Sequence, residues 1–162
     1  MKAPKDIADQ ALVLMADIFP TGYFAAHNAF SSFSREQIDE LTVVVIGCGP
    51  VGLCALINAE DFKPKHLFAV DGVESRLELA KSLGAEPWNF MTSRKELGER
   101  VKEVTDGRGA DVVIEVVGLS PALKMGFELL RPWGVMSSVG VHNGEVSEFY
   151  PPIAAGVREH LR

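Results

Sequence analysis

The chain has 162 residues, of which 47% are hydrophobic and 23% charged, a composition typical of one globular domain with a substantial core. Its net charge of −6, with no dense cluster of lysine and arginine, argues against nucleic acid as a partner, and its apolar runs end well before the roughly 18 residues that a membrane span needs. The N-terminus MKAPKDIADQ has no signal-peptide pattern, so we expect a cytoplasmic protein that acts on small molecules.

The first 40 residues are predicted to form a helical lead-in and not a separate domain. Residues 7–30 have the pattern of one helix, a break at Phe19 and Pro20, and a second helix that starts near Thr21. A polar loop over residues 34–40 is expected before the first strand.

From about residue 41 onward, strand-like and helix-like patterns alternate, as they do in βαβ units with a parallel sheet. Strands are predicted over residues 42–47, 66–71, 87–90, 110–118 and 134–141. Amphipathic helices are predicted after residue 52 and over residues 75–84, 93–107 and 120–134. We therefore predict the α/β class, with a Rossmann-type doubly wound parallel sheet of about five strands in the order 3-2-1-4-5.

Three glycines stand where the first predicted strand meets its helix. Gly47 permits a tight turn, Gly49 lets the backbone approach a pyrophosphate, and Gly52 lets strand and helix pack closely. The helix N-terminus supplies N–H groups and partial positive charge for phosphates, and Pro50 removes no useful hydrogen bond there. Asp71 ends the next predicted strand, which completes the pattern of a dinucleotide-binding βαβ unit.

Asp71 indicates which dinucleotide is bound. A carboxylate at this place accepts hydrogen bonds from both adenosine ribose hydroxyls and repels a 2′-phosphate, so we predict NAD in preference to NADP. Arg76, the cation nearest in sequence, either weakens this preference or is a solvated residue of the first helical turn. Cys48 and Cys54 are expected to be small buried hydrophobic residues and not a disulfide.

Five segments together resemble the coenzyme-binding half of the zinc-type medium-chain alcohol dehydrogenases. They are residues 17–26 (DIFPTGYFAA), 43–55 (VVVIGCGPVGLCA), 68–86 (FAVDGVESRLELAKSLGAE), 106–118 (DGRGADVVIEVVG) and 134–141 (GVMSSVGV). We accordingly divide the chain into a lead-in derived from the junction with a catalytic domain (1–40), an NAD-binding Rossmann domain (41–141) and a divergent tail (142–162). Pro151 and Pro152 exclude a regular strand in that tail, where residues 153–162 are expected to form a short helix.

The resemblance implies roles for residues near the two ends of the cofactor. Thr21 and Val51 are similar in place to residues that pack against the nicotinamide, and Arg76 to a basic residue at the adenosine ribose. Asp17 stands where the family places a Cys, Asp or Glu bound to, or close to, the catalytic zinc.

It also implies roles for two strand ends. Val116 and Val117 are similar to residues that line the cofactor cleft, and Val139, Gly140 and Val141 resemble the strand end whose backbone holds the carboxamide.

The family reaction is hydride transfer between an alcohol carbon and the nicotinamide, with zinc as the Lewis acid that lowers the pKa of the alcohol. A catalytic zinc needs three protein ligands and an open fourth position. The family's Cys, His and Glu ligands come from a domain that precedes this segment, and here Asp17 is the one candidate. The histidines, His27, His66, His142 and His160, are scattered. We therefore expect a truncated product that binds NAD but neither holds zinc nor oxidises alcohols by itself.

Three functions follow as hypotheses. The first is the NAD-binding domain of a zinc-type dehydrogenase that acts on a small alcohol or polyol in the context of a complete protein. The second is a stand-alone NAD-binding module without catalysis, and the third is a zinc-independent oxidoreductase that resembles quinone reductases, in which Asp17 has no metal role. A homo-oligomer is left open under each of them.

Overall fold

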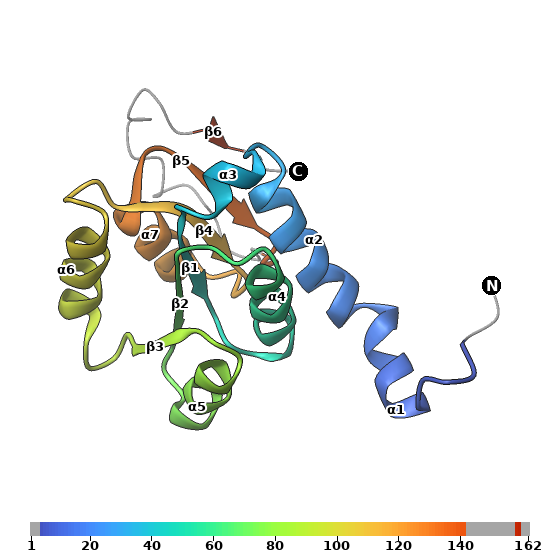
Figure 1. Ribbon diagram of the computed structural model, residues 1–162. Coiled ribbons are helices and arrows are strands. Elements are labelled where there is room, and N and C mark those ends of the chain that lie inside the picture. The colour runs from blue at the N-terminus through green and yellow to red at the C-terminus, as the bar shows by residue number, and fades with distance from the viewer. Residues whose placement is uncertain (1–3, 142–157, 160–162) are drawn as a thin grey trace.

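The computed structural model describes residues 4–141 and the backbone of residues 158–159, and it shows a sheet with helices on both faces (Figure 1). The strands are β1 (Thr42–Ile46), β2 (His66–Asp71), β3 (Glu86–Asn89), β4 (Ala110–Glu115), β5 (Leu130–Ser138) and β6 (Arg158–Glu159). The helices are α1 (Asp9–Leu12), the 3-10 helix η1 (Val13–Ala16), α2 (Ile18–Phe30), α3 (Arg35–Ile38), α4 (Pro50–Asp61), α5 (Glu74–Ser82), α6 (Arg94–Val104) and α7 (Ser120–Leu129).

The described strands form one parallel sheet in the order β3-β2-β1-β4-β5-β6. The predicted α/β class and the predicted order of the first five strands are confirmed. Two expectations for the tail, a helix over residues 153–162 and the exclusion of a strand, are wrong at Arg158–Glu159, which form β6 and pair with Val135 and Met136 of β5. The edge of β5 offers backbone N–H and C=O groups to a passing segment, and this pairing overrides local helix preference. The rest of the predicted tail lies outside the described residues.

The core lies on both faces of the sheet because successive side chains of a strand point in opposite directions. Val43 and Val45 of β1 belong to a cluster that α2, α4 and α5 cover, whereas Val44 and Ile46 belong to one covered by α6 and α7. All four side chains are buried. Burial of each such side chain stabilises the fold by about 1.5–3 kcal/mol, so β1 contributes to the hydrophobic core on both faces of the sheet.

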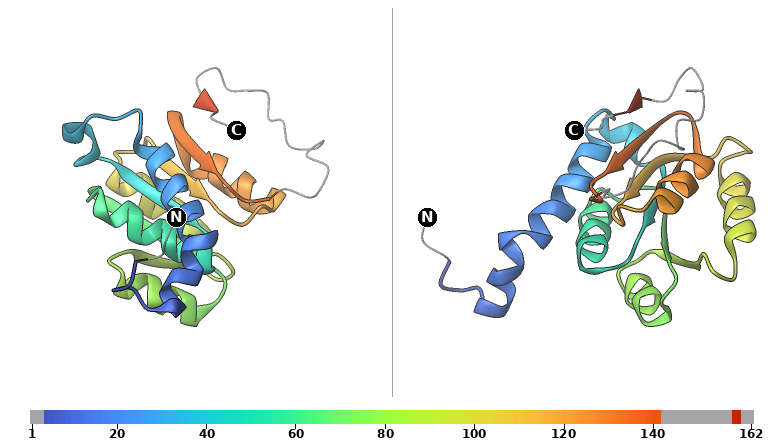
Figure 2. Two further views of the ribbon diagram at one scale, coloured as in Figure 1. Left: turned by 90° about the vertical axis from the view of Figure 1, so that its right-hand side faces the viewer. Right: turned by 180° about the vertical axis from the view of Figure 1, so that it is seen from behind.

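The helical lead-in breaks at a different residue from the one predicted. Asp17, with φ −153° and ψ −63°, separates η1 from α2, and Pro20 lies inside the first turn of α2. Since the N–H groups of a first helical turn have no intrahelical acceptor, proline is tolerated there, and the predicted break at Phe19 and Pro20 is wrong. The elements α1 and η1 bury no residue and lead away from the sheet (Figure 2).

Among the helices of the described residues, none has the length and hydropathy that a membrane-spanning segment requires.

Residues 34–40, predicted as a polar loop, contain the short helix α3. The Ser34 side chain accepts a hydrogen bond from the backbone N–H of Gln37, and the Gln37 side chain accepts one from the backbone N–H of Ser34. This capping box satisfies donors that a helix start leaves open, so a polar sequence forms a stable turn of helix.

Three strand boundaries differ from prediction by three or more residues. β4 ends at Glu115, before the predicted limit at Gly118. β5 begins at Leu130, inside the predicted helix, and ends at Ser138, before the predicted limit at Val141. The register shifts between Ala110 and Val112 opposite the start of β5, where Trp133 has a φ of 63°. The start of β5 is not recognisable from the local sequence pattern, because the strand contains a bulge and a proline there, and both are typical of loops.

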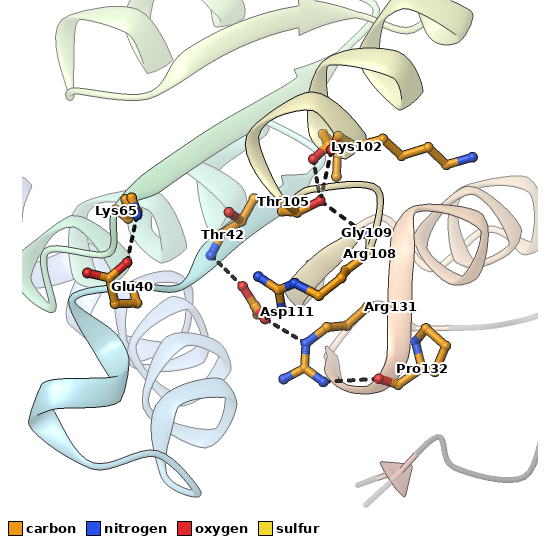
Figure 3. Close-up of polar contacts among 11 residues, drawn as sticks. Glu40, Thr42, Lys65, Lys102, Thr105, Arg108, Gly109, Asp111, Arg131 and Pro132 are labelled. Atoms are coloured by element: carbon orange, nitrogen blue, oxygen red, sulfur yellow. Dashed lines mark hydrogen bonds and ion pairs between the residues drawn. The ribbon is translucent and has the colours of Figure 1, made fainter.

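A buried carboxylate joins three strands at the edge of the sheet where they begin (Figure 3). Asp111 of β4 accepts hydrogen bonds from the backbone N–H of Thr42 at 2.9 Å and from Nε of Arg131 at 2.6 Å. An Nη atom of Arg108 lies 3.4 Å from the same carboxylate. These contacts therefore hold β1, β4 and β5 together at their N-terminal ends, on the side of the sheet away from the carboxyl ends of the strands.

Candidate functional site

The chain forms a cleft at the carboxyl ends of the central strands. In a doubly wound sheet the connections from neighbouring strands leave in opposite directions at one point, here between β1 and β4, and a crevice opens there. The cleft has a volume of about 600 Å³. Its lining comprises Ile46, Gly47, Gly49, Val70, Asp71, Gly72, Val73, Arg76, Phe90, Met91, Arg94, Val116, Val117, Leu119, Pro121, Ala122 and Met125.

The glycine turn forms the floor of this cleft. Gly47 has a φ of +98°, which side-chain-bearing residues rarely adopt, and its N–H donates to the carbonyl of Val70 at 2.8 Å. A Cβ at Gly52 would lie 1.8 Å from the carbonyl oxygen of Gly47, so α4 packs against the turn only without a side chain there. A Cβ at Gly49 would have no atom of the described residues within 4 Å apart from its chain neighbours. Packing within the described part of the chain therefore does not require glycine here, and the missing side chain leaves space open in front of the α4 N-terminus.

The first turn of α4 completes the floor. Pro50 occupies a position in this turn, and Gly49 is the N-cap with no side chain to cap the helix. Because the first N–H groups of a helix have no intrahelical acceptor, those of Val51 and Gly52 are available to a ligand that approaches past Gly49.

Asp71, at the end of β2, is held in a fixed orientation beside the turn. Its Oδ2 accepts a hydrogen bond from the backbone N–H of Cys48 at 2.7 Å, and its Oδ1 accepts one from the backbone N–H of Val73 at 2.9 Å. Its residue is 7% exposed, and an Nη atom of Arg76 lies 3.7 Å from Oδ2. Each carboxylate oxygen has a second lone pair, so the bound carboxylate still accepts hydrogen bonds from the cleft.

Aromatic and apolar side chains that the sequence analysis did not single out stand next to Asp71. A Cβ at Gly72 would lie 3.1 Å from Cε1 of Phe90 and 3.3 Å from Cγ of Met91, and both side chains line the cleft and are exposed. Both follow the end of β3, and the position after a parallel strand is the signal that points to them. They form an apolar wall on the β2 side of the cleft.

The two cysteines are free and buried, as predicted. Burial and the nearby Asp71 carboxylate raise the pKa of the Cys48 thiol to about 12, against an opposing effect of Arg76. Burial also raises the pKa of Cys54. Both sulfurs are therefore protonated at neutral pH, and neither acts as a thiolate nucleophile.

The predicted residues on the β4 and β5 ends divide into two sets. Val116 and Val117 line the cleft, whereas Val139, Gly140 and Val141 lie outside its lining. This second set follows the end of β5, which the structure places at Ser138. Even so, the two ends touch, because a Cβ at Gly140 would lie 2.1 Å from the backbone N of Gly118.

Glu115 is a further residue that the sequence analysis missed, and it lies behind the cleft without lining it. It ends β4 and is fully buried. Its Oε1 accepts hydrogen bonds from the backbone N–H groups of Val117 and Gly118, and its Oε2 accepts one from the hydroxyl of Ser138. The sequence does contain a signal for this residue, because Glu115 is an acidic residue inside an apolar strand. Acidic side chains are rarely buried without partners, so a glutamate at this position indicates a buried polar contact.

Asp17 and Thr21 lie apart from the cleft lining, at the start of α2. The Thr21 hydroxyl donates a hydrogen bond to Oδ1 of Asp17 at 3.0 Å. Within residues 4–141, no group of three or more His, Cys, Asp or Glu side chains is placed to hold a metal ion. The described residues therefore do not fit a zinc site, whereas the glycine turn and Asp71 fit a dinucleotide.

Comparisons with known proteins agree with this geometry. The sequence pattern of a family described as zinc-binding dehydrogenase matches residues 50–158. Over 146 residues the chain is 73% identical to zinc-type alcohol dehydrogenase B of Aspergillus flavus, a match that covers 90% of this chain and 34% of that protein. A medium chain reductase/dehydrogenase, ucsI of Acremonium, is 50% identical over 143 residues, with 88% of this chain and 49% of the relative covered.

Solved structures show the same likeness. Alcohol dehydrogenase TADH from Thermus sp. superposes with a TM-score of 0.80 at 32% identity, over 98% of this chain and 45% of that one. The alcohol dehydrogenase of Aeropyrum pernix gives a TM-score of 0.76 at 30% identity, over 93% of this chain and 42% of that one. The chain thus spans a third to a half of the length of these relatives.

Proposed function

The chain belongs to the zinc-binding dehydrogenase family, and from that premise we propose that its cleft binds NAD(H) for hydride transfer from a small alcohol or polyol to NAD, or from NADH to the corresponding carbonyl compound. The observation that carries the proposal is that one cleft contains two features of a dinucleotide site. The missing side chain of Gly49 leaves space in front of α4, and the buried carboxylate of Asp71 lies beside the glycine turn. When bound, the nicotinamide would accept or release the hydride.

The pyrophosphate would lie against the N-terminus of α4. There the backbone N–H groups of Val51 and Gly52 donate hydrogen bonds, and the helix dipole favours the negative charge. Gly49 permits the approach, because any side chain would occupy the space that the phosphates need.

The adenosine would lie on the β2 side of the cleft. Asp71 accepts hydrogen bonds from the ribose hydroxyls with the lone pairs that Cys48 and Val73 leave open. Phe90 and Met91 supply an apolar surface for the adenine. A 2′-phosphate would meet the Asp71 carboxylate at close range, and this repulsion favours NAD over NADP. Arg76 offsets it only partly, since its nearest nitrogen is 3.7 Å from Asp71 and its side chain is half exposed.

The proposal assigns the chain the coenzyme half of the reaction. Asp17 remains a candidate for contact with a zinc ion and Thr21 for contact with the nicotinamide, but activation of an alcohol by zinc requires ligands beyond the described residues. We propose that the chain by itself binds NAD(H) without oxidising alcohols; a cytoplasmic location and the lack of a nucleic-acid partner stay predictions from composition.

The test is a titration of the purified chain with NADH and with NADPH, followed by nucleotide fluorescence. We expect NADH to bind at least about tenfold more tightly than NADPH. D71S should weaken NADH binding by roughly 1–3 kcal/mol, the scale of hydrogen bonds lost to a ligand's polar groups. D61S, which changes an exposed carboxylate at the end of α4, is the matched control and should bind like the unmodified chain. Equal affinity for both nucleotides, or no binding, would refute the proposal.

Two further measurements separate the alternatives. Zinc content by elemental analysis, with assays on simple alcohols and on quinones, distinguishes an NAD-binding module from a complete oxidoreductase. Stoichiometric zinc together with turnover of an alcohol would show that ligands outside the described residues complete the site. Turnover of a quinone without zinc would favour the zinc-independent hypothesis.

A further inference from the structure

The buried carboxylate of Glu115 joins the segments on the β4 side of the cleft. Its Oε1 accepts hydrogen bonds from the backbone N–H of Val117 at 2.8 Å and of Gly118 at 2.7 Å. Its Oε2 accepts one from the Ser138 hydroxyl at 2.7 Å. The side chain therefore turns back on the loop that follows β4 and reaches the end of β5 at the same time.

The loop that Glu115 holds lies against the glycine turn. A Cβ at Gly47 would lie 2.7 Å from Cγ2 of Val117 and 3.2 Å from Cγ2 of Val116. The backbone N–H of Val116 donates to the carbonyl of Ile46 at 3.1 Å, which fixes the start of this loop to the end of β1. A change in the loop would therefore change the wall that faces the pyrophosphate floor.

The same loop touches the segment after β5 backbone to backbone. A Cβ at Gly118 would lie 2.5 Å from the carbonyl oxygen of Val141, and one at Gly140 would lie 3.0 Å from Oε2 of Glu115. No side chain fits between these segments. Their relative position thus depends on the carboxylate that bonds to both, together with the hydrogen bond from the Val139 N–H to the Glu115 carbonyl at 3.0 Å.

We propose that Glu115 is a positioning residue for the nicotinamide half of the bound cofactor. This inference rests on the proposed function. Asp71 on β2 marks the adenosine side, and the glycine turn after β1 marks the pyrophosphate, so a cofactor that continues across the sheet places its other half against the ends of β4 and β5. Glu115 holds these two ends together and does not itself line the cleft.

A carboxylate suits this position because one side chain accepts from two backbone N–H groups and a hydroxyl at once. Glutamine retains one acceptor oxygen for the two N–H groups, and its amide N–H can donate to the Ser138 hydroxyl, so E115Q should preserve the arrangement. Alanine leaves two buried N–H groups without this acceptor, which allows the loop to shift toward other partners.

The experiment compares the affinities of NADH and ADP-ribose for the unmodified chain, E115Q, E115A and S138A. ADP-ribose carries the adenosine and pyrophosphate but lacks the nicotinamide. Its affinity is measured by calorimetry. For E115A we expect NADH binding to weaken at least about tenfold and ADP-ribose binding to change less than about twofold. E115Q should bind both nucleotides within about threefold of the unmodified chain, and S138A should lose NADH affinity alone, by about threefold.

The outcomes separate this inference from the proposed function. If the unmodified chain binds neither nucleotide, the proposed function fails. If it binds both, and E115A either weakens both equally or weakens neither, the positioning role is overturned, as it is if E115Q is as impaired as E115A. Should E115A fail to fold, as judged by thermal unfolding, S138A decides: a loss confined to NADH supports the role, and unchanged affinity for both nucleotides refutes it.

Discussion

Two glycines of the same turn are expected to respond in opposite ways to one added methyl group. Gly49→Ala places a Cβ that has no described residue other than its chain neighbours within 4 Å, whereas Gly52→Ala places one 1.8 Å from the carbonyl oxygen of Gly47. The first variant should therefore fold normally and lose affinity for the dinucleotide. The second should lose stability, because α4 and the turn have to move apart.

The magnitudes follow from the backbone. Gly49 has φ −70° and ψ −174°, which alanine adopts without strain. Restriction of the unfolded chain should then stabilise by about 0.4–1 kcal/mol, and replacement of an N-cap glycine costs a similar amount, so the net change should be within about 1 kcal/mol. At Gly52 the close contact is with backbone and not with the end of a flexible side chain, and we expect a loss of at least about 3 kcal/mol, the upper range for overpacking.

Urea unfolding of both variants gives the stabilities, and NADH fluorescence gives the affinities. G49A should unfold near the midpoint of the unmodified chain and bind NADH at least about tenfold more weakly. Full NADH affinity in a folded G49A would refute the placement of the pyrophosphate against this turn. A G52A chain as stable as the original would show that the contact between α4 and the turn is looser than the structure indicates.

Two other residues give independent predictions. The pKa of the Cys48 thiol is raised from 9.0 to about 12 in the folded chain, so its contribution to stability is present below the unfolded pKa and is lost as pH rises through 9. The unfolded chain then loses the proton first, and the folded state should be less stable at pH 10 than at pH 8 by on the order of 1 kcal/mol. Urea unfolding of C48A at both pH values should lack this component, and identical pH dependence in the two chains would contradict it. D111A removes the acceptor of the buried Thr42 N–H and the partner of Arg131, so the free energy of unfolding should fall by about 2–3 kcal/mol. NADH affinity of folded D111A should not change, because Asp111 lies at the opposite edge of the sheet; a stability loss below about 0.5 kcal/mol would show that water replaces the contact.

Some differences between prediction and structure were readable in the sequence. Ser34 and Gln37, three residues apart, carry the capping-box signature of a helix start, although the segment was predicted as a loop. Pro20 is likewise as compatible with a first helical turn as with a break. In both cases the polar or proline-containing sequence had two local interpretations, and the structure adopts the one that satisfies the donors of the helix start.

The sequence by itself determined the βαβ order, the sheet covered on both faces, the glycine turn and the position of Asp71 at a strand end. These features depend on periodicity and on backbone requirements within a few residues, such as the positive φ of Gly47, which a linear pattern expresses directly.

Only the tertiary structure decided which distant groups meet. Two such contacts join segments that are far apart in sequence: Glu115 with Ser138, and β6 with β5. A third, the approach of Arg76 to Asp71, depends on how the turn between them folds. Hydrogen bonds and ion pairs of this kind require distances near 3 Å, and no local pattern specifies the distance between two elements. The sequence therefore indicated several residues that line the cleft, among them Gly49 and Asp71. It did not reveal the buried carboxylate of Glu115, which joins the loop after β4 to the end of β5.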